Sequence, residues 1–361
     1  MYGVSSDTFW LLKMQFPDQN VTPGRGKIAV VETLRGVASL FVLFCHWGST
    51  DAPGWIQSPF LGALLDELTT GVYIFFAISG FIMPYALYRG NYRLQNLGSF
   101  VLKRIVRLDP PYLLAIVFCL LVSYLASLHP QSKVPFVFNS QNLFLHLLYL
   151  CPFFGQDWVT GGGGGFWTLG IEFQYYLILA LIFPLLNHSR RWVMWSTLGL
   201  FTCATIWDEW FRWRFILPYT PFFAMGIITF WYYISRIQIQ TYLVTLGLLT
   251  VLAIWKFEIY YAAGAVGTAL LIAFYRRPYA PLQFFGKISY SLYLFHAAIA
   301  LRVVNYCTRF EWGRHWNWLI ILCGCAACIG LASLVYYLVE RPSRDYSQRI
   351  RYKQPKFQSA V

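Results

Sequence analysis

The sequence predicts an all-α, polytopic transmembrane helical bundle that crosses the bilayer about ten times. Hydrophobic residues make up 58% of the 361 residues and charged residues only 12%, which is too little charge to cover the surface of a soluble protein. Aromatic residues reach 20%, and their rings favour the headgroup zone of a membrane. We therefore expect a lipid bilayer to cover much of the molecular surface.

Apolar runs of about 20 residues, the length that crosses a bilayer core, recur along the whole chain. Lysine and arginine residues concentrate in alternate connecting segments, which the positive-inside rule places in the cytoplasm. This asymmetry predicts that both termini are cytoplasmic. The segment 143–154 is apolar but too short to cross, so we expect it to be re-entrant or interfacial. The predicted spans cover residues 28–48, 70–88, 108–128, 166–187, 192–208, 215–234, 240–256, 259–275, 286–306 and 317–338.

Three parts follow from this pattern: a cytoplasmic N-terminal segment (1–27), a transmembrane domain (28–345) and a basic cytoplasmic tail (346–361). The net charge of +13 could indicate a nucleic-acid partner. However, the charges lie in short segments between apolar runs, which is how membrane topology is encoded, so we expect no nucleic acid. Nothing in the sequence indicates an oligomeric state.

Residues 99–108 are predicted to form a separate basic helix, with Ser99 as its N-cap and Pro110-Pro111 ending it before the next span. Spacings of three and four residues place its basic side chains near one face. A juxtamembrane helix that contacts anionic lipid is the favoured interpretation from this pattern alone, and an anionic ligand is the alternative. The basic side chains are Lys103, Arg104 and Arg107.

Arg35 and His46 stand out in the first predicted span. An arginine within a span is costly, so Arg35 should face the bundle interior and have a partner there. The two residues are separated by ~16 Å along a helix and lie within ~20° of the same face. Such a stripe suits a long substrate with a charged end and a reactive end. The alternative is that Arg35 pairs with Glu32 at the interface and that His46 is an interfacial histidine.

Glu172 is the second polar anomaly, about two turns into the predicted span 166–187. A carboxylate in this setting is either paired or protonated. Because Glu172 and His46 both lie near the outer ends of their spans, we expect them to meet as a base and its orienting carboxylate. A structural bridge between Glu172 and an arginine is the alternative.

Residues 285–296 carry several polar side chains on one span, ending in His296. Serine and tyrosine commonly join helices within membranes, so packing is a strong alternative to a functional role here. The polar side chains are Lys287, Ser289, Tyr290, Ser291, Tyr293 and His296.

Two further segments have simple interpretations. The run Gly161–Gly165 is predicted to be a flexible outer loop, with a gate for an acceptor as the alternative. Cys323, Cys325 and Cys328 lack the polar surroundings of a metal site, so we assign them to helix packing and expect no metal.

Taken together, these segments resemble the acyltransferase-3 family of integral membrane O-acyltransferases. The matching stretches occur in order between about residues 28 and 345. Phe295 stands where tryptophan is commoner in the family, and Lys103 where arginine is commoner; neither change removes a proposed function. The stretches are Val31–Ala38 with His46, Phe75–Phe81, Lys103–Arg107 with Pro110-Pro111-Tyr112, Phe166–Tyr176, Gly286–His296 and Glu340-Arg341-Pro342.

The resemblance implies a single-domain O-acyltransferase of a bacterial inner membrane, without the appended hydrolase-like domain of some relatives. Its co-substrate would be acyl-coenzyme A, most often acetyl-coenzyme A. Its acceptor would be a hydroxyl of a cell-surface or exported glycan or glycolipid, or of a small metabolite.

The same resemblance implies the roles of the site residues. His46 would be the general base and Glu172 would set its tautomer. Direct transfer and an acyl-histidine intermediate both remain open. The acyl donor would be bound by four cationic and two hydroxyl side chains, and the cationic side chains would bind its phosphate groups. These residues are Arg35, Lys103, Arg104, Arg107, Ser289 and Tyr290.

The predicted topology implies that the two substrates enter from opposite faces of the membrane, the acyl donor from the cytoplasm and the acceptor from outside. The competing class is a transporter or exporter of a glycan or small metabolite, which would also place charges within the membrane. The sequence shows neither an internal repeat across its halves nor paired broken helices. A non-catalytic membrane scaffold or sensor is the third possibility.

Overall fold

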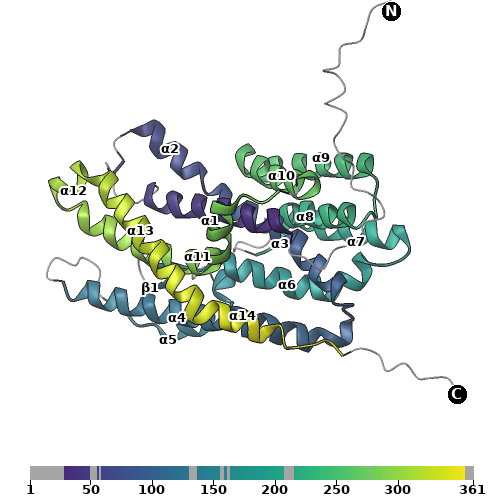
Figure 1. Cartoon of the computed structure of the whole chain (residues 1–361), viewed down its shortest axis with the longest axis horizontal. Helices are drawn as coiled ribbons and strands as arrows, with labels where there is room; N and C mark the ends of the chain where they lie inside the picture. The colour runs from purple at the N-terminus through teal and green to yellow at the C-terminus, as the bar shows by residue number, and fades with distance from the viewer. Residues whose placement is uncertain are drawn as a thin grey trace, which may run out of the picture.

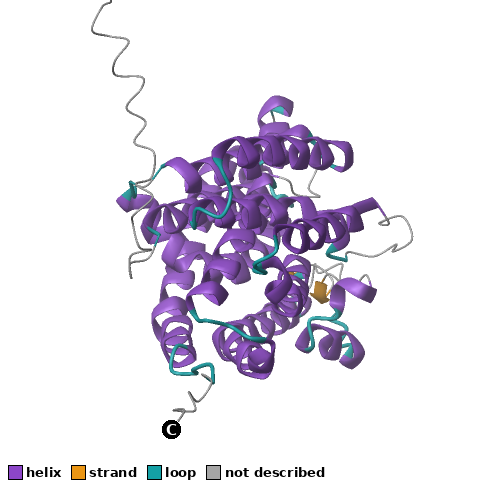
Figure 2. Cartoon of the chain, turned by 90° about the vertical axis from the view of Figure 1, so that its right-hand side faces the viewer, coloured by secondary structure: helices purple, strands orange, loops and turns teal. Residues whose placement is uncertain are grey.

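The computed structural model describes residues 28–48, 55–56, 58–129, 136–154, 158–160, 163–206, 215–275 and 277–353. Nearly all of this part of the chain is helical, and Figure 2 shows the small strand region in orange among the helices. Most long helices run along the long axis of the view in Figure 1, as expected for a bundle. The predicted all-α transmembrane bundle is therefore confirmed as a fold class.

The element order follows the predicted apolar runs closely. The longer helices are α1 (Ala29–Gly48), α3 (Thr70–Arg89), α4 (Leu97–Ser127), α6 (Trp167–Leu186), α7 (Arg191–Cys203), α8 (Thr220–Tyr233), α9 (Ile239–Lys256), α10 (Ile259–Phe274), α11 (Ala280–Cys307) and α13 (Asn317–Val335). The shorter elements are α2 (Pro59–Glu67), η2 (Leu94–Asn96), α5 (Ser140–Leu147), η3 (Cys151–Phe154), β1 (Trp158–Thr160), β2 (Gly163–Gly165), η5 (Leu217–Tyr219), α12 (Glu311–His315), η6 (Tyr336–Glu340) and α14 (Arg341–Ser347).

Seven helical stretches within the described residues are long and apolar enough to cross a membrane. They contain α1, α3, α4, α6, α9, α11 and α13. The other predicted spans coincide with α7, α8 and α10, which have 13, 14 and 16 residues. A helix of 16 residues rises only ~24 Å, less than a bilayer core of ~30 Å. The count of about ten spans and the cytoplasmic position of both termini therefore stay predictions.

The prediction that Pro110-Pro111 ends a separate basic helix is wrong. α4 begins at Leu97, without a side-chain cap from Ser99, and continues through both prolines to Ser127. A proline removes one backbone donor, but an apolar environment penalises an unravelled backbone still more, so membrane helices tolerate prolines. A neighbouring helix also contributes to the backbone bonding here, since the Tyr290 hydroxyl of α11 donates to the Leu108 carbonyl at 2.9 Å.

α1 and α11 form an unusually close helix pair at two glycines. A Cβ atom on Gly36 would lie 2.0 Å from the Leu282 carbonyl oxygen, and one on Gly286 would lie 1.9 Å from the Glu32 carbonyl oxygen. Only glycine permits this approach, in the manner of small residues at membrane helix interfaces. The contact sets the register of α1 against α11, and that register positions the polar residues further along both helices.

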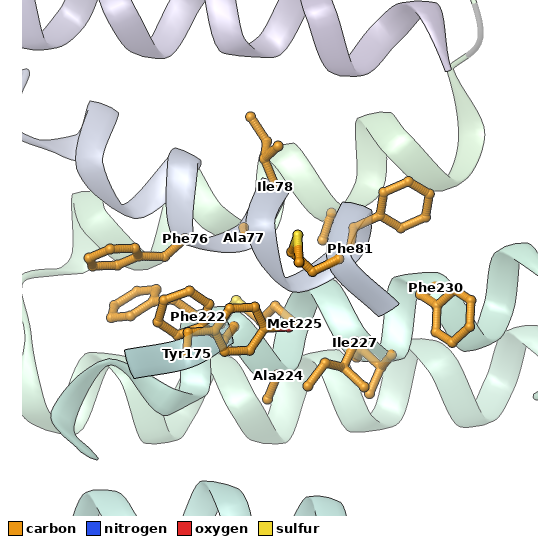
Figure 3. Close-up of a cluster of buried hydrophobic side chains, with 14 of the residues drawn as sticks. Phe76, Ala77, Ile78, Phe81, Tyr175, Phe222, Ala224, Met225, Ile227 and Phe230 are labelled. Atoms are coloured by element: carbon orange, nitrogen blue, oxygen red, sulfur yellow. The ribbon is translucent and has the colours of Figure 1, made fainter. Parts of the chain in front are cut away.

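α3 occupies the centre of the bundle and packs against α1, α6, α8 and α10. Its buried aromatic and aliphatic side chains interdigitate with those of α8, as Figure 3 shows around Phe76 and Phe81. Tyr175 of α6 joins this cluster by stacking on Phe223 of α8, with ring centroids 4.1 Å apart. Because α3 is surrounded on several sides, it holds α6 and α8 in fixed positions relative to α1.

α9 is at the periphery and presents large apolar side chains outward, including Leu248 with 67% of its surface exposed. A soluble protein rarely exposes such a continuous apolar face. The face matches a lipid environment. Its side chains are Leu243, Val244, Leu248, Val251 and Trp255.

The segments around the Gly-rich run are more ordered than predicted. Gly163–Gly165 form β2, which pairs antiparallel with β1, with Trp158 opposite Gly165; Gly161 and Gly162 lie outside the described residues. The segment 143–154 consists of the end of α5, a turn and η3, so it contains no helix long enough to cross. Its re-entrant or interfacial position stays a prediction.

Replacing Gly286 by alanine should destabilise the protein by about 1–3 kcal/mol, because the new methyl group collides with the backbone of α1 and forces the two helices apart. The thermal unfolding midpoint in detergent measures this. Gly267→Ala in α10 is the matched control, since its Cβ would meet nothing within 4 Å and alanine favours a helix. Equal midpoints for the two variants would contradict the close helix contact.

Candidate active site

A cavity opens between α1, α3, α4, α6 and α11. It brings together most of the predicted site residues: Arg35, Arg104, Arg107, Glu172, Ser289 and Tyr290. The other polar side chains that line it are Ser79, Thr168, Tyr176, Tyr293 and Glu340. Predicted residues that do not line it are His46 and Lys103.

Arg104 is the clearest sign of an anion site. Its side chain is only 7% exposed, and the Nε atom has no hydrogen-bond partner among the described residues. The guanidinium lies over the rings of Phe100 and Tyr176, at 5.3 and 5.7 Å from their centroids. These ring contacts hold the plane of the Arg104 guanidinium in position, but they do not provide hydrogen-bond acceptors for its N–H groups. A buried arginine with an unused donor in a cavity fits an anionic ligand.

Arg35 reaches across the close contact between α1 and α11. Its Nε and one terminal nitrogen donate to the Ser289 Oγ atom at 3.1 and 2.9 Å. Ser289 in turn donates to the carbonyl of Gly286, at 2.9 Å. Arg35 therefore has a partner in the bundle interior, as the interior interpretation predicted. The glycine contact brings α11 close enough for this bond to form.

Glu340 is a functional candidate that the sequence analysis did not assign to the site. It ends the π-helical element η6, and its Oε2 atom accepts from the backbone amide and the hydroxyl of Ser291, at 3.2 and 2.6 Å. Its carboxyl group lies within electrostatic range of Arg35 and Arg107. A π-helix often marks a functional site. The sequence feature that could have indicated Glu340 as a site residue is its position directly before Arg341, at the end of an apolar run.

Glu172 accepts hydrogen bonds from the Ser79 hydroxyl, at 2.5 Å, and from the Tyr176 hydroxyl one turn along its own helix. These two donors satisfy a carboxylate without a cation in direct contact. No arginine among the described residues forms the alternative direct bridge with Glu172, and Arg104 contacts the Tyr176 ring. Glu172 thus lines the cavity with its carboxyl group held between α3 and α6.

His46 lies near the C-terminal end of α1 and contacts α11. Its Nδ1 atom is 3.1 Å from the Val42 carbonyl oxygen and 3.4 Å from Nε2 of His296. The two imidazole rings meet edge to face, with centroids 4.7 Å apart. His46 and Glu172 form no direct hydrogen bond with each other among the described residues, and a contact between them through one water stays a prediction. The reason for the missing direct bond is geometric: the polar face of α1 is directed at α11, whereas Glu172 is held against α3.

Tyr293 connects the cavity to the two histidines. It lines the cavity, and its hydroxyl shares a hydrogen bond with that of Thr168. Its ring centroid is 6.0 Å from that of His296, which follows one helical turn later. The histidine pair therefore lies just beyond the Tyr293 end of the cavity.

Lys103 does not line the cavity but contacts the C-terminal part of the described chain. Its ammonium group lies 5.6 Å from the ring centroid of Tyr352, near the end of the described chain. The neighbouring Lys353 exchanges hydrogen bonds with Asn96 of η2, at 2.9 and 3.3 Å. The first part of the basic tail is thus attached to the start of α4, and Lys103 belongs to that contact.

Comparisons with known proteins agree with this arrangement. The sequence model of the acyltransferase-3 family, described as an acyltransferase domain, matches residues 28–337. The chain is also similar to Nodulation protein 10 of Rhizobium leguminosarum bv. viciae, with 25% identity over 360 residues that cover 86% of this chain and 92% of the relative. No solved structure matches. Because the family match spans most of the residues, the chain belongs to the acyltransferase-3 family and is an integral, multi-pass membrane protein.

Proposed function

We propose that this protein is a membrane O-acyltransferase that moves an acyl group, most often acetyl, from cytoplasmic acyl-coenzyme A to a hydroxyl group. The acceptor is a cell-surface or exported glycan or glycolipid, and the membrane is a bacterial inner membrane. One observation carries the proposal: in an acyltransferase-family chain, a buried arginine with an unused donor, Arg104, lines a cavity together with two further arginines.

The arginines bind the phosphate groups of coenzyme A. Arginine suits this role because its planar fork donates to two phosphate oxygens at once and keeps its charge when buried. Arg104 and Arg107 lie on α4, on the predicted cytoplasmic side where acyl-coenzyme A is made. Glu172 and Glu340 also line the cavity, and they offset part of the cationic charge until the ligand arrives.

The pantetheine arm extends from the arginines toward the histidines. Along α1, Arg35 and His46 are separated by ~16 Å, a span that an extended arm can cover. The arm passes Tyr293, which borders both the cavity and His296. The thioester is thereby presented to His46 in the outer half of the membrane, where an acceptor from outside can reach it.

His46 acts as the general base. The acceptor oxygen attacks the thioester carbonyl carbon while Nε2 of His46 takes the hydroxyl proton. The carbon–sulfur bond then breaks, and the ester product and coenzyme A thiolate separate. The proton on His46 passes to the thiolate, which restores the neutral imidazole. Arg35 and the other arginines hold the donor in place throughout.

His46→Ala should lower acyl transfer by at least about 100-fold, the usual contribution of a general base. Transfer of a radiolabelled acetyl group from acetyl-coenzyme A to the glycan fraction of host membranes, by purified protein in liposomes, measures this. Protection against thermal unfolding by coenzyme A should be unchanged, because His46 does not line the cavity. Activity close to that of the parent would exclude His46 as the base.

Arg104→Gln should weaken coenzyme A binding and reduce the rise in unfolding temperature that saturating coenzyme A produces. Loss of a charge-assisted contact corresponds to about a tenfold or larger increase in the dissociation constant. Lys103→Gln is the matched control, being one residue away but outside the cavity.

Equal protection of both variants by coenzyme A would show that the arginine does not bind the donor. A parent protein that coenzyme A never stabilises would instead favour an exporter of glycans or metabolites.

A further inference from the structure

We infer that His296 is a positioning residue for His46: its Nε2 atom accepts a hydrogen bond from Nδ1–H of His46 and stabilises the imidazolium form during acyl transfer. This inference rests on the proposed function, in which His46 is the base. It assigns to His296 the role that the sequence analysis gave to Glu172. The argument depends on which nitrogen of each ring carries hydrogen, and backbone carbonyl groups determine that.

The tautomer of His296 follows from two carbonyl groups of its own helix. Its Nδ1 atom lies 2.8 Å from the Tyr293 oxygen and 3.0 Å from the Leu292 oxygen. Carbonyl oxygens only accept hydrogen bonds, so Nδ1 must carry the hydrogen. Nε2 of the neutral ring is then left with a lone pair. The side chain is 2% exposed, and this lone pair is directed at His46.

The tautomer of His46 follows in the same way. Its Nδ1 atom faces two acceptors, the Val42 carbonyl oxygen at 3.1 Å and the Nε2 lone pair of His296 at 3.4 Å. Nδ1 must therefore carry the hydrogen, and Nε2 holds the lone pair. Nε2 of His46 has no hydrogen-bond partner in the part of the chain that the structure describes. It is the nitrogen available to an acceptor hydroxyl.

The imidazolium of His46 needs an acceptor because its neighbours are apolar. Leu43, Trp47 and Leu292 belong to one buried cluster around this end of α1 and α11. Glu172, the carboxylate that could have served, is engaged by Ser79 and Tyr176. When Nε2 takes a proton, the Nδ1–H donor becomes charged and its bond to His296 shortens and strengthens. His296 stays neutral, and the proton that His46 gains at Nε2 later passes to the coenzyme A thiolate.

Two substitutions separate this role from simple packing. His296→Gln keeps an acceptor oxygen for His46 but fits a buried apolar site poorly. His296→Phe keeps a ring of similar shape but has no acceptor. A positioning role requires the glutamine variant to be the more active, whereas a packing role requires the phenylalanine variant to be the more active. His296→Leu, which also lacks an acceptor, replaces the phenylalanine variant should that one not fold.

The test is the acetyl transfer assay in liposomes, with coenzyme A protection as the measure of folding. We expect His296→Phe to lose about 10- to 100-fold in turnover while His296→Gln keeps several times more activity, and both to retain coenzyme A protection. Full activity in His296→Phe or His296→Leu, with an active parent, would overturn this inference alone. A parent that transfers no acetyl group would overturn the proposed function and, with it, this inference.

Discussion

The close contact between α1 and α11 is the constraint on which the rest of the site depends. Gly36 and Gly286 allow the two backbones to touch, and no side chain can separate the helices there. From that point both helices run in the same direction, so successive turns of α1 meet successive turns of α11. Arg35 meets Ser289 near the contact, and His46 meets His296 further along. One packing contact thus aligns an anion-binding end and a proton-transfer end.

The cavity combines charges that a membrane would otherwise exclude. Arg35, Arg104 and Arg107 line it together with two carboxylates, Glu172 and Glu340. Each carboxylate is fixed by hydroxyl groups, from Ser79 and Tyr176 in one case and from Ser291 in the other. Hydroxyl donors hold both carboxyl groups in place, and within the described part of the chain neither carboxyl group forms a direct ion pair with these three arginines. Arginines arranged in this way keep donor groups available for the phosphates of an acyl donor.

The sequence was sufficient to predict those parts of the structure that depend on the local pattern of apolar and charged residues. The predicted apolar runs coincide with helices because bilayer-length hydrophobic segments have few other conformations. Most of the predicted donor residues line one cavity, since an arginine within an apolar run needs an interior position. The continuous α4 was missed because the preference of proline for helix starts is weaker than the need of a membrane backbone for internal hydrogen bonds.

The partners of single side chains could not be predicted, because they depend on how helices pack. His46 was expected beside Glu172, since both lie near the outer ends of their spans. That reasoning predicts how deep each side chain lies in the membrane, but it does not predict which neighbouring helix each side chain faces. His46 faces His296 on α11, whereas Glu172 faces Ser79 on α3. Glu340 was missed for the same reason, because only the turn of η6 brings it near Arg35 and Arg107.

The central claim is that the arginine-lined cavity binds acyl-coenzyme A and directs its thioester toward His46. A cryo-electron microscopy structure of the protein in nanodiscs with coenzyme A tests it most directly. The account predicts phosphate density beside Arg35, Arg104 and Arg107, with the thiol end of the pantetheine arm near Tyr293. Coenzyme A bound elsewhere, for example at the surface formed by Lys103 and Tyr352 with the cavity left empty, would contradict it.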